Sequence, residues 1–239
     1  TEYNEDGTIK RFYKTNPHAK DRIVKELVMD MDDTYYPEKP VVPFIKATQD
    51  RVVLEIQRGC IRGRRFCQAG MIYRPVRERS LEFLKERART MLKNTGHEEI
   101  SLSSLSSSDY SELKELVTFL IEEFKDQKIN ISLPSLRIDA FSLDVMGKVQ
   151  DIRKSSLTFA PEAGSQRLRD VINKGLTEEV ILEGAGMAFE GGWNRVKLYF
   201  MLGLPTETEE DMRGIAELSD KIARRYYEIP KDQRNGKVQ

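Results

Sequence analysis

The chain has 239 residues, with 39 basic and 39 acidic side chains, so its formal net charge is +0. This balance argues against a strongly basic nucleic-acid-binding module, and two cysteines are too few for a disulfide framework. No apolar run approaches the length of a membrane span, and no signal peptide opens the sequence. We therefore expect a cytoplasmic protein without a membrane partner, long enough to bury one barrel-sized core.

Residues 1–50 predict an extension that precedes the core. The pair Asp6-Gly7 lies between Tyr3 and the run Ile9-Lys-Arg-Phe12 and predicts a small hairpin, because it favours a tight turn between antiparallel strands. An extended connector follows, since proline fixes φ and biases the residue before it away from helix. The prolines of this connector are Pro37, Pro40 and Pro43. We expect the core at 51–228 and a truncated linker at 229–239.

From residue 51 onward, strand patterns alternate with helix patterns. The expected strands are 51–57, 99–105, 129–133, 156–159 and 196–202. Helices are expected after each of them; the first four begin near residues 80, 109, 142 and 177, and the last runs through Met212, Ile215, Leu218 and Ile222. Strands separated by helices pair in parallel with right-handed crossovers. The sequence therefore predicts an α/β fold, a partial (β/α) barrel behind an N-terminal extension that contains a hairpin.

The helix after the second strand has the clearest pattern. Its apolar residues follow the three-four spacing of one buried stripe. They are Leu113, Leu116, Val117, Leu120, Ile121 and Phe124. Asp109 and Glu112 predict a cap pair at its N-terminus. After the third strand, Arg137 and Asp139 predict a structural ion pair at the mouth of the barrel.

Both cysteines lie in the loop after the first expected strand. With Cys60 and Cys67 in place, a cysteine at position 64 would complete the spacing CxxxCxxC. That spacing can put three thiolates around one face of a [4Fe–4S] cube, because soft sulfur is a good ligand for iron. The residue present is Arg64, and a guanidinium that stays protonated cannot ligate iron. The spacing alone also fits two ordinary loop thiols that can oxidise to each other.

The residues around these cysteines resemble the signature of the radical S-adenosylmethionine (SAM) superfamily. Phe66 occupies the aromatic slot of the motif Cys-x3-Cys-x-aromatic-Cys. The run QAGMIYRPVRERS at 68–80 narrows the match to members that often carry a cobalamin-binding domain upstream. The resemblance covers about residues 50–228. It implies a six-stranded open barrel, of which five βα units are present, with strand six beyond Gln239 in a longer protein.

The resemblance implies an enzyme that reductively cleaves SAM at a [4Fe–4S] cluster and generates a 5′-deoxyadenosyl radical. Cys60 and Cys67 would be metal ligands, an external donor would supply the electron, and cobalamin would bind through a domain outside this chain. The substrate is unknown, and nucleic acid stays among the candidates. Because Arg64 leaves two thiolates where this site uses three, we expect weak or absent cluster binding. The alternative is a non-catalytic relative that binds SAM or a partner without a cluster.

The resemblance also implies SAM contacts on the later strands. Glu162 corresponds to the carboxylate that accepts hydrogen bonds from the SAM ribose, since a carboxylate suits vicinal hydroxyls. Lys174 lies near the position of a cation that binds the SAM carboxylate. Taken without the family, Glu162 is equally well a helix N-terminal acid, and Lys174 is a solvated charge at a helix end.

Two further turns complete the expected SAM site. Ser104 and Ser106, with Ser103 beside them, fall where the strand-two loop of the family contacts the SAM amino group. Serine runs are also common as plain turn and capping residues. Gly203 and Leu204 open the turn Gly-Leu-Pro-Thr-Glu-Thr, which resembles the strand-five turn whose backbone packs against adenine. Glycine lets a flat base approach because it has no side chain to block it.

Arginines crowd the cysteine segment and allow two interpretations. One is a solvated rim around the loop. The other is a site for anionic groups, such as the SAM carboxylate or a nucleic-acid phosphate. The residues concerned are Arg58, Arg62, Arg64, Arg65, Arg74, Arg77 and Arg79.

Overall fold

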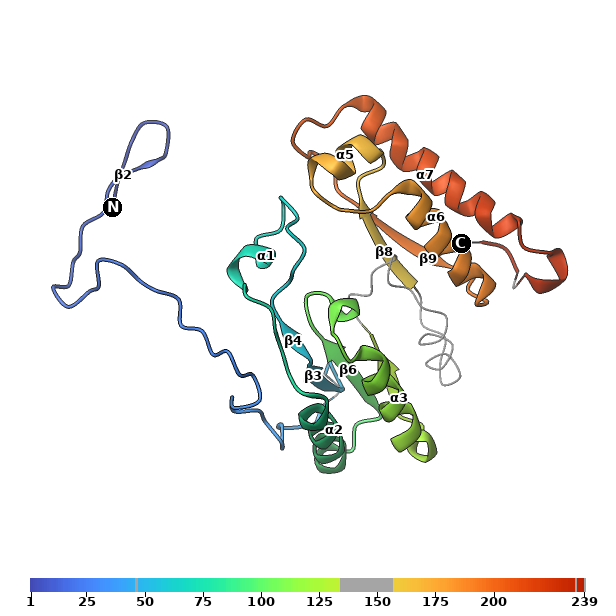
Figure 1. The fold of residues 1–239 in the computed structure, drawn as a ribbon, viewed down its shortest axis with the longest axis horizontal. Coiled ribbons are helices and arrows are strands. Elements are labelled where there is room, and N and C mark those ends of the chain that lie inside the picture. The colour runs from blue at the N-terminus through green and yellow to red at the C-terminus, as the bar shows by residue number, and fades with distance from the viewer. Residues whose placement is uncertain (46, 134–156, 235, 239) are drawn as a thin grey trace.

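A computed structural model describes residues 1–45, 47–133, 157–234 and 236–238 of the chain. The chain forms an N-terminal extension followed by two βα layers (Figure 1). The expected helix near 142 and the Arg137–Asp139 pair lie outside the described residues. Among the described helices, none is long and apolar enough to cross a membrane.

The first layer is a parallel sheet covered by two helices. Its strands, in spatial order, are β3 (Val52–Glu55), β6 (Glu99–Ser103) and β7 (Asn130–Ser132). Helices α2 (Leu81–Thr95) and α3 (Leu113–Glu123) pack on one face of this sheet. The residues of β3 alternate accordingly, because Val52 and Leu54 are buried while Val53 between them is exposed.

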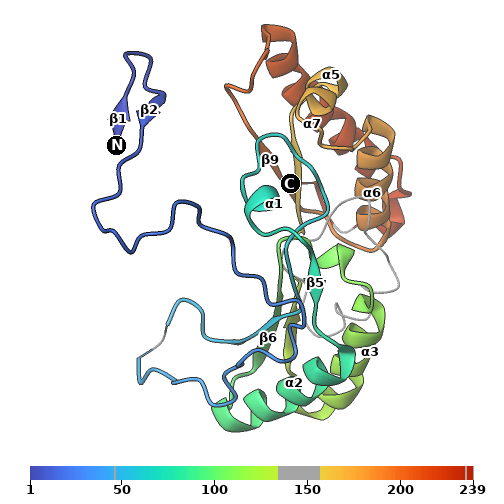
Figure 2. The same ribbon diagram turned by 60° about the vertical axis from the view of Figure 1, so that its left-hand side comes forward.

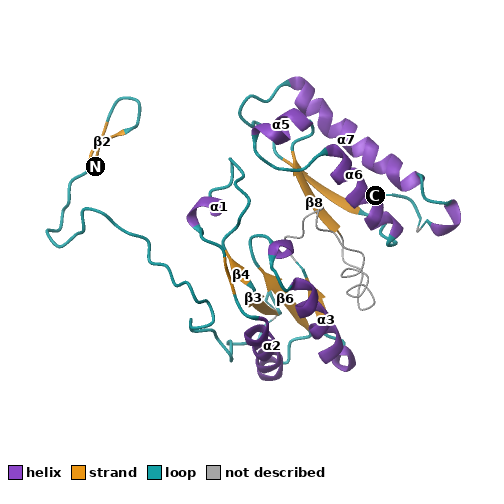
Figure 3. Cartoon of the chain, viewed as in Figure 1, coloured by secondary structure: helices purple, strands orange, loops and turns teal. Residues whose placement is uncertain are grey.

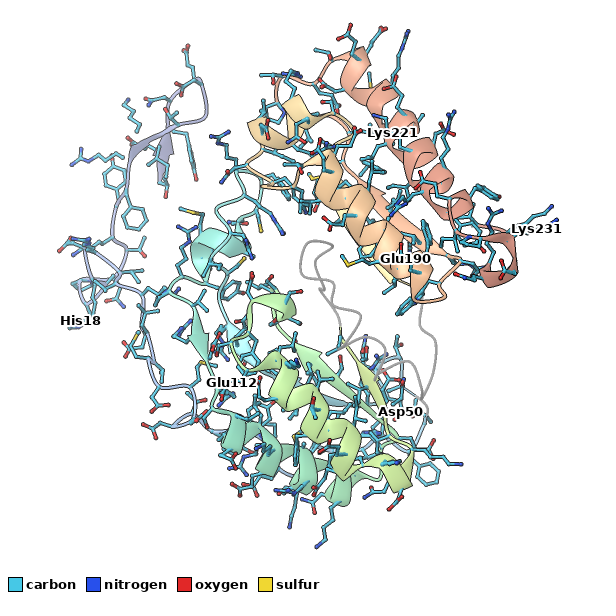
Figure 4. All side chains as sticks on the ribbon, turned by 45° about the vertical axis from the view of Figure 1, so that its right-hand side comes forward. His18, Asp50, Glu112, Glu190, Lys221 and Lys231 are labelled. Atoms are coloured by element: carbon cyan, nitrogen blue, oxygen red, sulfur yellow. The ribbon has the colours of Figure 1, made fainter. Side chains whose placement is uncertain are left out.

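The second layer repeats this arrangement. Strands β8 (Leu157–Glu162) and β9 (Val196–Phe200) pair in parallel. Helices α6 (Glu178–Glu190) and α7 (Glu209–Tyr227) cover them around a core that includes Phe159 and Tyr226. Lys221, labelled on α7 in Figure 4, pairs with Glu178 of α6 at 2.5 Å. Five parallel strands in the described residues confirm the predicted α/β fold.

Short elements connect the layers. They are β4 (Gln57–Arg58), α1 (Ala69–Ile72), β5 (Arg77–Glu78), α5 (Gln166–Val171) and the 3₁₀ turns at Ser107–Asp109, Lys125–Gln127 and Lys231–Gln233. Strands β4 and β5 pair antiparallel, so they close the cysteine segment as a long loop between them. Figure 3 shows this loop as largely irregular chain that reaches toward α5.

Helices α2 and α6 begin close to their predicted starts, and local sequence signals fix their ends. The hydroxyl of Ser80 caps α2 by accepting from the Phe83 N–H at 3.2 Å, and Gly96 ends α2 in the left-handed region with φ 67°. Thr177 caps α6 in the same way. The cap pair expected for α3 is wrong, because Glu112 is the N-cap without a side-chain bond and Asp109 pairs with Arg62 instead.

The extension has two parts with different surroundings. Strands β1 (Glu2–Tyr3) and β2 (Ile9–Arg11) form the predicted hairpin, which stands apart from both layers in Figures 1 and 2. The connector, by contrast, packs on the first layer. The hydroxyl of Tyr36 donates to the Val53 carbonyl and accepts from the Glu55 N–H, each at 2.9 Å. This one side chain therefore binds two backbone groups along β3.

Candidate functional site

The carboxyl ends of the parallel strands carry the predicted site residues. A small apolar cluster joins three of the segments there. Phe66 of the cysteine loop packs against buried residues that follow β8 and β9. These are Ala163, Leu168, Ile172 and Leu204. The structure thus brings Phe66 and Leu204 together although they lie far apart in the sequence.

Hydrogen bonds fix the cysteine loop to the second layer at the same place. The Arg65 N–H donates to the Ile172 carbonyl at 3.0 Å, and the Asn173 amide donates to the Gly63 carbonyl at 2.8 Å. The Arg65 guanidinium also binds the Val171 carbonyl at the end of α5. Carbonyls at a helix C-terminus lack partners within the helix, so an arginine there both satisfies them and joins the layers.

Cys60 and Cys67 are both free thiols, the first buried and the second partly buried. The chain turns sharply before Cys60, where Gly59 has φ +99° and a Cβ would come within 2.6 Å of the Tyr73 carbonyl oxygen. After Cys60 it folds back, since the Cys67 N–H donates to the Arg64 carbonyl at 3.2 Å. Arg64 and Cys67 therefore belong to one turn of the loop, which this bond closes.

The side chains of this loop do not fit a [4Fe–4S] cluster. Within the described residues there is no group of three or more Cys, His, Asp or Glu side chains that could hold a metal ion. Two thiols and the Arg64 guanidinium occupy the three positions of the spacing, and a protonated guanidinium has no lone pair to donate. Arg64 is half-buried, and its Nε has no hydrogen-bond partner among the described residues.

Glu162 and Lys174 form an ion pair, with Lys174 Nζ 3.1 Å from Glu162 Oε1. Both side chains are largely buried, at 3% and 16% exposure for the lysine and the glutamate. Glu162 adopts the left-handed region with φ 69°, which is uncommon for a residue other than glycine and often marks a functional position. The structure therefore places two predicted site residues in direct contact at the end of β8.

The serine loop after β6 is held by its own hydroxyls. Ser104 Oγ lies 3.0 Å from Ser107 Oγ and accepts from the Ser106 N–H at 3.1 Å. The Ser106 carbonyl accepts from Gln57 Nε2 at 2.5 Å. Gln57 Oε1 and Ser106 Oγ are buried without a partner in the described part of the chain. Gln57 was not predicted as a site residue, although a glutamine that continues an apolar strand pattern is a signal for one.

A cavity of about 280 Å³ opens between the ends of β3 and β6. It is lined by Glu55, Gln57, Arg58, Gly59, Tyr73, Ser103, Ser104 and Leu105. The cavity therefore joins the serine loop to the start of the cysteine loop. A charged pair lines it, because Arg58 Nε and Nη2 bind Glu55 at 2.8 and 2.7 Å, and Glu55 raises the pKa of Arg58.

The turn after β9 is also fixed by polar contacts. Gly203 has φ +77°, and its N–H donates to Glu207 Oε2 at 2.6 Å. Asp211 is buried at the start of α7, where it accepts from the Thr208 N–H at 2.9 Å and from Arg167 Nε at 3.3 Å. Arg167 Nη2 in turn donates to the Thr206 carbonyl at 2.8 Å. Asp211 and Arg167, which the sequence did not single out, therefore position the turn that contains Gly203 and Leu204.

The arginines of the cysteine segment have different partners. Arg77 and Arg79 are buried and donate to carbonyls of the connector, and burial lowers the pKa of Arg79. Arg62 binds Asp109, with Nε to Oδ2 at 3.0 Å. Arg77 and Arg79 are therefore not part of a solvated rim, whereas Arg58, Arg65 and Arg74 are exposed.

Comparison with known proteins gives matches along most of the chain. Residues 54–219 match the radical SAM superfamily. The chain is 36% identical to the uncharacterized protein MJ0966 of Methanocaldococcus jannaschii over 93% of this chain and 45% of that protein. It is 26% identical to the threonylcarbamoyladenosine tRNA methylthiotransferase MtaB of Aquifex aeolicus, over 75% of this chain and 45% of that enzyme. The chain thus spans less than half the length of these relatives.

Two solved structures have a similar fold. The radical SAM methyltransferase TsrM of Kitasatospora setae superposes with a TM-score of 0.58 and 14% identity, over 72% of this chain and 34% of that one. The cobalamin-dependent SAM radical enzyme OxsB superposes with a TM-score of 0.55 and 14% identity, over 78% of this chain and 27% of that one. At this identity the likeness concerns the fold, and it agrees with the predicted partial barrel.

Proposed function

Because this chain belongs to the radical SAM superfamily, as its cysteine loop predicted, we propose that it is the SAM-binding core of a radical SAM enzyme. Members with the complete motif cleave SAM reductively at a [4Fe–4S] cluster and generate a 5′-deoxyadenosyl radical, chemistry that the cofactor supplies. The observation that carries the proposal is the packing of Phe66 against the apolar cluster that contains Leu204, together with the buried Glu162–Lys174 pair. These contacts lie at the carboxyl ends of parallel strands, where βα barrels keep their sites.

We assign the polar SAM contacts to the second layer and the serine loop. Glu162 accepts from the ribose hydroxyls, and Lys174 binds the SAM carboxylate at the end of the same strand. Ser104 and Ser106 receive the amino group. The unpartnered Ser106 hydroxyl supports this assignment, because a buried polar atom without a partner costs stability until a ligand satisfies it.

The adenine would lie on the turn at Gly203 and Leu204. Gly203 presents no side chain, and nothing lies within 4 Å of where its Cβ would be. A flat base can therefore approach the backbone at this turn. Asp211 and Arg167 hold the turn in place through Thr206 and Thr208.

Arg64 favours a second candidate, a cluster-deficient relative that binds SAM or a partner without cleaving SAM. Cys60 and Cys67 would remain as metal ligands only beside a third thiolate, which this loop does not supply.

Under the first candidate an external donor supplies the electron, and cobalamin binds through a domain outside this chain, as the cobalamin in OxsB suggests. The substrate stays open, with nucleic acid among the candidates because MtaB is a tRNA methylthiotransferase. We place the protein in the cytoplasm.

Anaerobic iron–sulfur reconstitution of this chain beside an Arg64→Cys version separates the two candidates. We expect only the cysteine version to gain the brown charge-transfer absorbance and to release 5′-deoxyadenosine from SAM with a reductant. We expect both versions to bind S-adenosylhomocysteine in calorimetry, because the proposed SAM contacts do not include residue 64. Equal iron loading in both would contradict the interpretation of Arg64, and loss of ligand binding in both would contradict the SAM site itself.

A further inference from the structure

Arg169 of α5 is a buried cation to which the proposed SAM site gives no role. Its side chain is 0% exposed, and burial lowers its pKa. The guanidinium is hydrogen-bonded on every side chain nitrogen. It donates to Gln166 Oε1 at 3.0 Å and to the carbonyls of Ala163 at 3.1 Å, Gly164 at 2.8 Å and Leu176 at 3.1 Å. Because taking a charge out of water is costly, the acceptors that compensate it indicate what this side chain holds in place.

Two of these carbonyls belong to the turn that directly follows Glu162. Glu162 itself lies in the left-handed region with φ 69°, a conformation that costs free energy unless the surroundings hold it. The guanidinium of Arg169 binds the carbonyls of Ala163 and Gly164. Helix α7 also packs closely on this turn, since a Cβ at Gly164 would clash with the backbone N of Ile215. Contacts to the two residues after Glu162 therefore fix how the chain leaves β8.

The same arginine holds the turn that carries Lys174. This turn is irregular, because Asn173 and Gly175 on either side of Lys174 have positive φ values of 54° and 65°. The Lys174 N–H donates to the Arg169 carbonyl at 2.8 Å. The Leu176 carbonyl accepts from Arg169 Nε at 3.1 Å. Arg169 is thus bonded to this turn through its backbone and its side chain, and to the turn after β8 through its side chain.

We propose that Arg169 is a positioning residue for the SAM site, which holds the turns of Glu162 and Lys174 at the separation that ligand binding requires. The inference rests on the proposed function, in which Glu162 binds the ribose and Lys174 the carboxylate. The 3.1 Å contact between these two side chains spans the two turns. A guanidinium suits this task because its N–H groups form a rigid fork that reaches carbonyls of different segments. Lysine has the same charge on a single nitrogen, so it cannot reach all of these acceptors at once.

Binding of S-adenosylhomocysteine to the Arg169→Lys variant, measured by calorimetry, tests the proposal. We expect the substitution to weaken binding about tenfold, because the two turns lose their common donor. The matched control is Arg87→Lys on α2, where the arginine side chain is 18% exposed and pairs with Glu38. It makes the same exchange in the first layer and should leave binding unchanged.

A double-mutant cycle with Glu162→Gln separates positioning from general support of the fold. If Arg169 acts through Glu162, Arg169→Lys should weaken binding by no more than about threefold once Glu162 is already replaced. A residue that only supports the fold would weaken binding by the same factor in both backgrounds. Circular dichroism checks that each variant is folded. If Arg169→Lys is not, Gln166→Ala removes one acceptor of the guanidinium instead and should weaken binding less in the Glu162→Gln background than in the unchanged chain.

The outcomes also distinguish this inference from the SAM site itself. No binding of S-adenosylhomocysteine by the unchanged chain would remove the SAM site and the role of Arg169 with it. Unchanged binding in Arg169→Lys, equal weakening in the Arg87→Lys control, or equal factors in the two backgrounds would remove only the role of Arg169.

Discussion

Asp211 is the residue whose hydrogen bonds fix the turn after β9. Replacing it by asparagine keeps the shape of the side chain and removes the negative charge to which Arg167, Ser165 and Thr208 donate hydrogen bonds. We expect the free energy of unfolding to fall by about 2 kcal/mol, because hydrogen bonds to charged groups are stronger than neutral ones. Urea denaturation at pH 7 measures the loss. Asp220→Asn, on the exposed side of the same helix, is the control, and an equal loss there would refute the role of Asp211.

The same carboxylate predicts a pH dependence with a defined sign. The Arg167 guanidinium is the main cause that lowers the pKa of Asp211 below its usual value of 3.8, and the Ser165 hydroxyl adds to it. Because the folded-state pKa is the lower one, the contribution of Asp211 is complete above about pH 4 and is lost as the pH falls toward the folded-state value. The stability difference between the unchanged chain and Asp211→Asn should therefore shrink below pH 4. A difference that increases in acid would contradict this sign.

At the scale of elements, the connector contributes to the stability of the first layer. Tyr36→Phe removes the hydroxyl that bonds both Val53 and Glu55 on β3. It leaves the ring contacts with Phe83 and Arg79 in place. We expect a loss of about 1–3 kcal/mol, since the backbone groups lose a partner. Tyr35→Phe is the matched control because Tyr35 is 91% exposed, and thermal unfolding of the two variants gives the comparison. Equal melting temperatures would show that the connector contributes nothing here.

Elements with a strong local pattern could be predicted from the sequence. The stripe of α3, the starts of α2 and α6, and the Asp6-Gly7 hairpin depend on residues close to one another in the chain. Helix α5 was not predicted, because six residues are too few to show a helical period. The cap pair of α3 failed for another reason. Asp109 binds Arg62, and a partner 47 residues away is invisible to a local pattern.

The residues of the candidate site likewise fall into two groups, those that a local sequence pattern predicts and those that it does not. Cys60, Cys67 and Phe66 could be found because their motif lies in one short segment. That Glu162 contacts Lys174 could not be read from spacing, since the contact depends on a left-handed residue at the end of β8. Gln57, Arg167 and Asp211 act through hydrogen bonds to other segments, so they become visible only when the layers are assembled.

At the scale of the whole molecule, the cysteine loop is the described segment that most directly joins the two layers. Phe66 packs into the cluster after β8 and β9, while the Gly63 carbonyl and the Arg65 N–H are bonded to residues that directly follow α5. Apolar packing and hydrogen bonds therefore act on one short loop. Removing the ring should loosen the loop and the turn at Leu204 together, because Phe66 and Leu204 pack in the same apolar cluster.

Phe66→Ala tests this coupling. The side chain is partly buried, so we expect a loss of about 2 kcal/mol, less than for a fully buried phenylalanine. Hydrogen exchange should increase in residues 60–68 and 203–208 at once, while α3, in the core of the first layer, keeps its protection. Phe12→Ala is the control, since Phe12 in the extension is 68% exposed. Faster exchange confined to 60–68 would mean that the cysteine loop moves alone and that Phe66 does not couple it to the turn at 203–208.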